Sequence, residues 1–152
     1  MITIIAAIAS NGVIGKDGKL PWSIHGELKH FKERTINNTV VMGRRTYNST
    51  AHPLINRNNI VISTTLEQKE CIDLCRSYEE AIEKAKTYNK QIFIIGGTRV
   101  YKKALEHVNH MIISHLKKAY DGDTYFPEWN PEEWKVINEQ DFGEYTIKEY
   151  KR

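Results

Sequence analysis

Short apolar runs rich in β-branched residues alternate with amphipathic stretches along the chain, and this alternation limits the fold more than any other feature. The runs read ITIIAAIA, TVVMG, NNIVIS, QIFIIGG and HMIISHLK. Strands that are buried on both faces of a parallel sheet have this nearly continuous apolar character, and helices form the crossovers between them. The sequence therefore predicts an α/β protein with a mostly parallel sheet.

One helix and one hairpin stand out in this pattern. The segment SYEEAIEKAKTY begins with Ser77 at an N-cap position, and Glu80 follows three residues later, which is the signature of a capping box. After Pro131 the pattern changes to two alternating runs, EWKVINEQDF and EYTIKEYK, joined by a turn around Gly143. We expect these two runs to pair antiparallel at one edge of the sheet.

The size of the chain favours a single domain over residues 1–152. A chain of 152 residues with 40% hydrophobic content can bury one sizeable core but not two. The apolar runs are all shorter than the roughly 18 residues that a membrane span needs, and the first residues contain no basic leader. We therefore expect a soluble, cytoplasmic protein with no membrane partner.

Charge and cysteine content exclude two further classes of function. The net charge of +3 comes from 22 basic and 19 acidic residues that are well mixed, so the sequence indicates no nucleic-acid partner. Cys71 and Cys75 lack the spacing of a redox pair, and we expect free thiols. Together with His107, His110 and His115 they are too scattered for a zinc site, so the sequence predicts no metal. We expect a monomer.

A carboxylate lies beside an apolar stripe near the start of the chain. In LPWSIHGELKHFK, read as a helix, one apolar stripe contains Ile24, Leu28, Phe31 and Thr35. Glu27 lies about 40° from Phe31 around the helix axis, at the edge of that stripe. Because an ionised acid is costly to bury without a partner, Glu27 is expected to bind a group that pairs with its carboxylate.

Two strand-to-helix junctions have the character of anion sites. In IFIIGGTRVYKK, glycines precede a helix start, where free N–H groups can bind a phosphate; a tight structural turn explains the same residues. In VVMGRRTYNS, Arg44 and Arg45 oppose the helix dipole unless an anion lies there, although an exposed turn is the alternative. The complete GxGxxG fingerprint is absent, so no standard Rossmann site is indicated.

A glycine-rich stretch, NGVIGKDGKLPW, precedes the Glu27 segment. The spacing of Gly12, Gly15 and Gly18 is typical of a mobile loop that closes over a pocket and excludes water. An ordinary surface loop is the alternative. The stretch by itself does not distinguish a lid from a surface loop.

Taken in order, IAAIASNGVIG, LPWSIHGELKHFK, VVMGRRTYNS, PLINRNNIVIS, IFIIGGTRVY and GDTYFP resemble the motif series of the dihydrofolate reductase family. The resemblance covers essentially the whole chain. It implies a central eight-stranded sheet, parallel except at its antiparallel C-terminal edge strand, with four flanking helices. It also implies NADPH-dependent reduction of 7,8-dihydrofolate to tetrahydrofolate for one-carbon metabolism, with hydride added to C6 and a proton to N5.

The resemblance assigns the substrate site. Glu27 would bind the pterin ring through N3 and the 2-amino group, supported by Ser114, and would act with Trp22 and Leu20 as the catalytic set. Arg57 would pair with the glutamate tail of the substrate, near His52. The apolar walls around the pterin and benzoyl rings would consist of Ile5, Ala7, Leu28, Phe31, Thr50, Leu54 and Ile95.

The resemblance also assigns the cofactor site. Arg44, Arg45, Thr64 and Arg76 would surround a 2′-phosphate, which favours NADPH over NADH. The Gly96-Gly97 peptide bond is expected to be cis. The other implied contacts are Ala7, Val13, Ile14, Gly15, Lys16, Asp17, Gly18, Lys19, Gly43, Thr46, Ser63, Gly96, Gly97, Thr98, Arg99, Val100, Tyr101, Lys102 and Lys103.

Some positions depart from the common pattern of the family, which often has Asp at the position of Glu27 and Met at the position of Leu20. Ala51 and Thr98 replace glycines, and His52 replaces a basic residue. Two other functions stay open. One is a related reductase acting on a pyrimidine intermediate of flavin synthesis, against which Trp22, Glu27 and Arg57 argue. The other is a non-catalytic nucleotide-binding module, which would have no use for Glu27.

Overall fold

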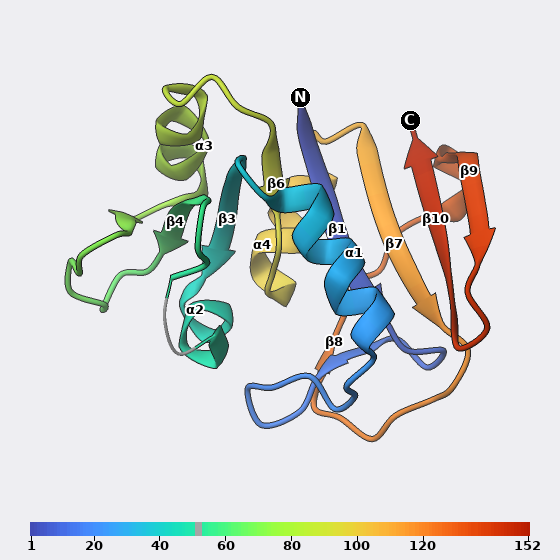
Figure 1. Cartoon of the computed structure of the whole chain (residues 1–152). Coiled ribbons are helices and arrows are strands. Elements are labelled where there is room, and N and C mark those ends of the chain that lie inside the picture. Colours follow the sequence, from blue (N-terminus) through green and yellow to red (C-terminus); the bar gives the residue numbers. More distant parts are fainter. Residues whose placement is uncertain (51–52) are drawn as a thin grey trace.

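A computed structural model of the chain describes residues 1–50 and 53–152, so the predicted roles of Ala51 and His52 lie outside the described residues. An eight-stranded sheet runs through the molecule in the order β5-β4-β3-β6-β1-β7-β10-β9 (Figure 1). In that order, the strands are β5 Asp73–Cys75, β4 Asn58–Ile62, β3 Thr39–Gly43, β6 Ile92–Ile94, β1 Ile2–Ile8, β7 His110–Leu116, β10 Tyr145–Lys151 and β9 Lys135–Asp141.

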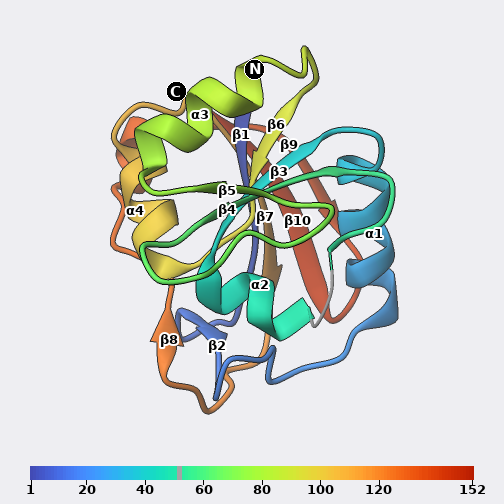
Figure 2. The same cartoon turned by 90° about the vertical axis from the view of Figure 1, so that its left-hand side faces the viewer.

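Helices cover both faces of this sheet. They are α1 His25–Thr35, α2 Arg44–Thr50, α3 Tyr78–Lys86 and α4 Thr98–Leu105, with a short 3-10 helix η1 at Pro131–Glu133. Helix α1 lies on one side, and α3 and α4 lie on the other (Figure 2). Side chains alternate accordingly, because Ile4 of strand β1 joins the core under α3 and α4 while Ile5 joins the core under α1.

The predicted parallel sheet and C-terminal hairpin are confirmed. The pairs β1–β6, β1–β7, β3–β4, β3–β6 and β4–β5 are parallel. Strand β10 runs antiparallel to both β7 and β9, and Gly143 in the turn between β9 and β10 has a φ of +91°. Because β10 lies between β7 and β9, the outermost strand is β9.

Three short strands were not predicted. Strand β5 is three residues long, and strands β2 (Val13–Gly15) and β8 (Thr124–Tyr125) form a separate two-stranded sheet. Segments of this length are too short for a two-residue periodicity to be recognised.

The capping box of α3 is confirmed in a modified form. The Ser77 hydroxyl accepts a hydrogen bond from the Glu80 N–H at 3.1 Å. The Glu80 carboxylate reaches back to the N–H of Arg76 at 2.9 Å, one residue before the cap. Both bonds fix the start of the helix.

The predicted stripe of α1 is displaced around the helix. Thr35 and Glu27 are buried, and Phe31 lies between them in angle, whereas Leu28 is 44% exposed. With about 100° per residue, Leu28 falls beyond Thr35 on the margin of the buried stripe. The prediction that Leu28 shares the buried stripe is wrong. Among the described residues, no helix has the length and apolarity to cross a membrane.

Candidate active site

Glu27 is a buried acid in the first turn of α1. Its side chain is only 6% exposed, and the neighbouring Ser114 of strand β7 is 2% exposed. Burial raises the pKa of the Glu27 carboxyl, and a hydrogen bond from the Ser114 hydroxyl opposes part of that shift. Within residues 1–50 and 53–152, no Lys, Arg or His forms an ion pair with Glu27. The predicted partnership of Glu27 with Ser114 is present, and the charge of Glu27 is not neutralised by a cation.

Apolar side chains surround this acid on the α1 face of the sheet. In the parallel register of β1 with β7, Ala7 lies opposite Ser114. The predicted wall residues that pack into one apolar cluster on this face are Ile5, Ala7, Phe31, Leu54 and Ile95. Thr50, at the end of α2, donates its hydroxyl to the Tyr47 carbonyl at 2.7 Å.

Arg57 is fixed against helix α1 by hydrogen bonds. Its Nε donates to the Ile55 carbonyl at 3.0 Å, and its Nη1 donates to the Thr35 hydroxyl on α1 at 3.0 Å. Partial burial lowers the pKa of the guanidinium, which nevertheless stays charged at neutral pH. The remaining N–H groups of Arg57 are those that a carboxylate could reach.

Asn59 is a structural residue of the site that sequence reasoning missed. Its side chain is 3% exposed and bonds the Leu54 N–H, the Leu54 carbonyl and the Arg57 carbonyl, each at 2.9 Å. These bonds fix the loop that presents both Leu54 and Arg57. An amide inside the apolar run NNIVIS was the signal for it.

Two tyrosines near Glu27 were also not predicted to act beside it. The Tyr101 hydroxyl donates to the Ile5 carbonyl at 2.9 Å and joins α4 to β1. A Cβ at Gly26 would lie 2.7 Å from the Tyr145 hydroxyl, so a larger residue at position 26 would require that side chain to shift. Burial raises the pKa of both phenols, and the charge of Glu27 adds to the increase.

Trp22 has the one buried polar side-chain atom without a partner in the described part of the chain. The ring is 7% exposed, and its Nε1–H forms no hydrogen bond. A buried donor left unpaired is costly, so a group that accepts from Trp22 would be bound favourably. Leu20, predicted for the same region, is 46% exposed.

The two strand-to-helix junctions lie side by side. The Gly43 N–H donates to the Gly96 carbonyl at 2.8 Å, and the Gly96-Gly97 peptide bond is cis, as predicted. Helix α4 begins at Thr98 without a side-chain cap, which leaves N–H groups of its first turn free. Gly96 has a φ of +134°, and a Cβ there would lie 2.9 Å from the Thr46 hydroxyl. The backbone therefore fits closely around this junction, as a phosphate site requires.

Arginines flank the junctions. Arg44 is the first residue of α2, Arg45 follows it, and both are exposed. Neither forms an ion pair with a described carboxylate. The pKa of Asp123 is lowered mainly by the hydrogen bond from the Asp17 N–H, and Arg45 makes a small contribution in the same direction. Arg76 donates from Nη1 to the Ser63 carbonyl at 2.8 Å and to the Leu66 carbonyl at 3.0 Å. It is thereby held beside Ser63 and Thr64, as the predicted phosphate site requires.

Several predicted cofactor contacts on α4 have other roles in the structure. The side chains of Val100 and Tyr101 belong to the core. Lys103 forms an ion pair with Glu79 on α3 at 3.4 Å, and the Thr98 hydroxyl donates to the Tyr125 carbonyl at 2.8 Å. Lys102 and Arg99 are exposed. Only the start of α4 adjoins the Gly43 junction.

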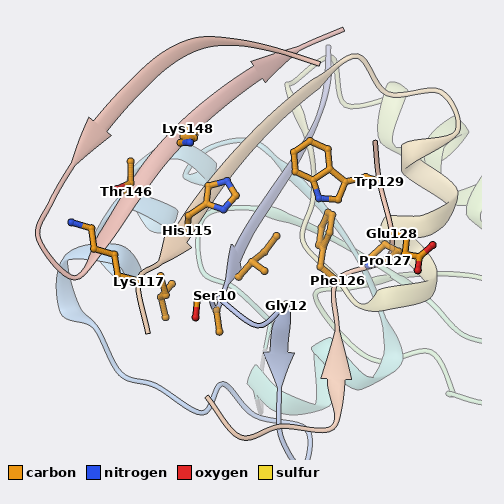
Figure 3. A pocket seen from close by; sticks show the side chains of 13 residues that line it. Ser10, Gly12, His115, Lys117, Phe126, Pro127, Glu128, Trp129, Thr146 and Lys148 are labelled. Atoms are coloured by element: carbon orange, nitrogen blue, oxygen red, sulfur yellow. The ribbon is translucent and has the colours of Figure 1, made fainter. Parts of the chain in front are cut away.

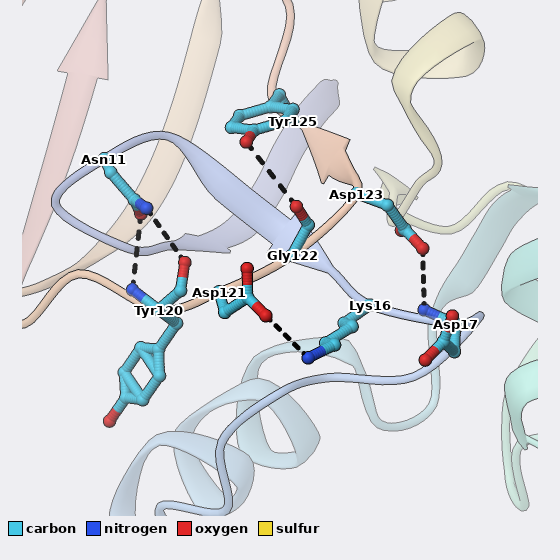
Figure 4. A network of polar contacts seen from close by, with 8 residues as sticks. All are labelled: Asn11, Lys16, Asp17, Tyr120, Asp121, Gly122, Asp123 and Tyr125. Carbon is cyan, nitrogen blue, oxygen red and sulfur yellow. Dashed lines mark hydrogen bonds and ion pairs between the residues drawn. The ribbon is translucent and has the colours of Figure 1, made fainter.

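The glycine-rich loop is tied to the segment 120–125 (Figure 4). The Asp123 N–H donates to the Gly15 carbonyl at 3.1 Å, and the Asp17 N–H donates to the Asp123 carboxylate at 3.0 Å. Lys16 and Asp121 form an ion pair at 2.7 Å, which raises the pKa of the lysine and lowers that of the acid. The loop is therefore held by polar contacts to a segment distant in sequence.

A separate cavity lies on the opposite face of the sheet and does not include the candidate site (Figure 3). His115 and Thr146 line it, whereas their neighbours in sequence face α1: Ile147 joins the core under that helix, and Ser114 bonds Glu27. Burial lowers the pKa of His115 to about 4, and its Nε2 bonds the Tyr150 hydroxyl at 2.8 Å. None of the predicted site residues lines this cavity.

Comparisons with known proteins identify the family of the chain. A family model described as dihydrofolate reductase matches residues 1–152. The dihydrofolate reductase of Haemophilus influenzae is 35% identical over 143 residues, which are 94% of this chain and 86% of that protein. The dihydrofolate reductase of Buchnera aphidicola from Acyrthosiphon pisum is 43% identical over 129 residues, 84% of this chain and 80% of that protein.

A solved structure is similar over the whole fold. It is dihydrofolate reductase from Enterococcus faecalis complexed with NADP(H) and RAB-propyl, with a TM-score of 0.91 and 34% identity, covering 100% of this chain and 96% of that chain. The chain belongs to the dihydrofolate reductase family.

Proposed function

We propose that this chain reduces 7,8-dihydrofolate to 5,6,7,8-tetrahydrofolate with NADPH, and that Glu27 is the residue that holds the pterin ring. One observation carries the assignment: Glu27 is buried, bonded to Ser114 and without a cationic partner in the described residues. A ring with adjacent N–H donors supplies the missing charge-assisted bonds. An acid with only a structural role would not be left in this state.

The donor groups at the paired junctions fit a phosphorylated nicotinamide cofactor. Unpaired N–H groups at the start of α4 and the exposed cations Arg44 and Arg45 provide donors and positive charge for phosphates. Arg76 and Thr64 extend that set, which favours NADPH over NADH. When bound, NADPH supplies the hydride.

The contribution of the protein is orientation and electrostatics. Side chains such as Ile5, Phe31 and Ile95 would hold the substrate rings so that donor and acceptor carbons lie about 3–3.5 Å apart. Glu27 would stabilise the protonated pterin, and a water would deliver the proton to N5, because in the family arrangement Glu27 lies too far from N5 for direct transfer. Trp22 would give its unpaired N–H to this region, and Leu20 with the loop 13–19 would exclude bulk water.

The outer end of the pocket fits the glutamate tail of the substrate. Arg57 is held by Thr35 and Ile55 with other N–H groups free for a carboxylate. We further propose that the chain acts as a monomer in the cytoplasm. Size-exclusion chromatography with light scattering would test the monomer.

The direct test of the function is the loss of NADPH absorbance when dihydrofolate is added to the purified protein. We expect turnover with dihydrofolate and none with a pyrimidine intermediate of flavin synthesis. Tight NADPH binding with no oxidation on adding dihydrofolate would instead indicate the nucleotide-binding module.

A further inference from the structure

The ring of Trp22 is supported by the ring of Tyr120. Their centroids lie 5.2 Å apart with an interplanar angle of 54°, and no other aromatic ring contacts Trp22 within the described residues. Tilted aromatic pairs at this separation are attractive and depend on angle. Since Trp22 is buried and its Nε1–H has no partner, the direction of that N–H depends on how the indole packs.

Tyr120 is itself held in place by Asn11. The Asn11 Nδ2 donates to the Tyr120 carbonyl at 2.8 Å, and the Asn11 Oδ1 accepts from the Tyr120 N–H at 3.4 Å (Figure 4). Next to this pair, the Ser10 N–H donates to the Lys118 carbonyl at 3.0 Å. These contacts join the end of strand β1 to the segment that carries Tyr120.

The contact of Tyr120 with Trp22 is made by the ring rather than by the hydroxyl. Among residues 1–50 and 53–152, the Tyr120 hydroxyl forms no hydrogen bond, and its side chain is half-buried against the α1-face core. Phenylalanine would therefore keep the contact, whereas an aliphatic side chain would lose the angular preference of an aromatic pair.

We propose that Tyr120, clamped by Asn11, is a positioning residue that sets the plane of the Trp22 indole and so the direction of its unpartnered N–H. The effect on catalysis rests on the proposed function, whereas the effect on Trp22 does not. Tyr120 acts through Trp22 and does not touch the substrate. Its neighbours Asp121 and Asp123 bind the loop at Lys16 and Asp17, so the segment 120–123 contacts both Trp22 and the glycine-rich loop.

The first experiment follows Trp22 directly in the ligand-free protein. The indole N–H signals of Trp22, Trp129 and Trp134 are assigned in ¹⁵N–¹H spectra with a Trp22→Phe variant as reference. We expect Tyr120→Leu to shift or broaden the Trp22 signal and leave the other two in place, and Tyr120→Phe to keep it. Asn11→Ala, which removes an exposed side chain and its two hydrogen bonds to Tyr120, is expected to move the same signal in the same direction.

The second experiment measures single-turnover hydride transfer and KM in the same variants. We expect Tyr120→Leu to slow hydride transfer roughly tenfold, as small misplacements of positioning groups do, with KM for NADPH unchanged. Tyr120→Phe is expected to restore the rate. If Tyr120→Leu does not fold, Asn11→Ala carries the same test.

Two results would overturn the proposal. One is an unchanged Trp22 signal in both Tyr120→Leu and Asn11→Ala. The other is a Tyr120→Phe variant as defective as Tyr120→Leu, which would mean that the hydroxyl and not the ring matters. A wild-type protein that does not oxidise NADPH with dihydrofolate would refute the proposed function, and the spectra would still decide whether Tyr120 positions Trp22.

Discussion

The Ser114 hydroxyl on strand β7 donates a hydrogen bond to the buried carboxylate of Glu27 on helix α1. Burial has the larger effect on Glu27 and raises its pKa, while the bond from Ser114 lowers it. Because the described residues provide no cation for Glu27, the protein retains this acid at a cost in stability. Replacing the acid by its amide therefore separates its role in catalysis from its effect on folding.

Glu27→Gln is expected to fold, to bind NADPH and to reduce dihydrofolate far more slowly than the wild type at pH 7. The amide removes the negative charge that favours protonated pterin, so the pKa of N5 in the bound substrate falls. The defect should shrink as the medium is acidified and the solution supplies the proton. The measurement is the pH profile of hydride transfer in both proteins. A wild-type rate at pH 7 in Glu27→Gln would show that the assignment of Glu27 to the pterin site is wrong.

The same variant is expected to unfold at a higher temperature than the wild type at pH 7. A carboxyl whose pKa is higher in the folded chain than its ordinary 4.5 favours folding when protonated, so stability falls as the pH rises through the folded pKa. The advantage of Glu27→Gln should therefore vanish on acidification below the unfolded pKa. Thermal unfolding against pH measures it. Glu33→Gln, exposed on the same helix, is the control and should stay within about 0.5 kcal/mol of the wild type.

Arg44→Ala is expected to weaken NADPH binding by roughly 1–3 kcal/mol, the range for losing a hydrogen bond to a charged group. NADH binding should scarcely change, because NADH lacks the 2′-phosphate. Titration calorimetry with both cofactors measures the difference, and Arg34→Ala on α1 is the control. Equal losses of binding free energy for the two cofactors would contradict the assignment of the 2′-phosphate to this site.

Gly15→Val is expected to slow hydride transfer by loosening the loop. The residue is buried, and a Cβ at Gly15 would lie 3.4 Å from the Thr124 Cβ, which is ordinary contact. Alanine therefore fits, whereas the branches of valine would push the loop away from strand β8. Single-turnover rates of Gly15→Val and of the control Gly15→Ala test this. If valine leaves the rate unaltered, the loop does not act as a lid.

His115 is expected to make the protein sensitive to acid. Its folded pKa of about 4 lies below the ordinary 6.5, so the folded state favours neutral His115 and stability is lost as the pH falls from 6.5 towards 4. The loss is on the order of 1–2 kcal/mol after allowance for partial exposure. Urea unfolding of the wild type and His115→Asn over this range measures it. Equal slopes against pH in the two proteins would contradict the assignment, and His25→Asn is the exposed control.

The fold was predictable where strands are long and buried. Runs such as TVVMG and HMIISHLK are almost entirely apolar, as strands buried on both faces are. The parallel sheet could therefore be predicted from local sequence. Strands β2 and β8 could not be predicted, because they exist through the pairing of Val13 with Tyr125, far away along the chain. A two-residue strand contains no periodicity of its own.

The same distinction applies to the candidate site. Some site residues are unusual in their local sequence and could be recognised from it. Glu27 is a charge beside an apolar stripe, and Arg44 and Arg45 are cations at a helix start. Tyr101 was predicted only as a cofactor contact, and its bond to the Ile5 carbonyl joins residues 96 positions apart. Contacts of that kind arise from topology and leave no trace in the spacing of residues.

The position of strand β10 has a consequence for synthesis on the ribosome. Its register places Ile147 opposite Ser114. Strand β10 therefore pairs with the edge of β7 that β1 does not occupy, and β7 carries Ser114, the partner of Glu27. Among the described residues, β10 is also the last strand to be translated. While the nascent chain lacks these residues, β7 is an exposed edge that can pair with other chains. A polysome-bound chain should therefore need chaperone protection of β7, and dihydrofolate binding should appear only after translation has passed residue 151.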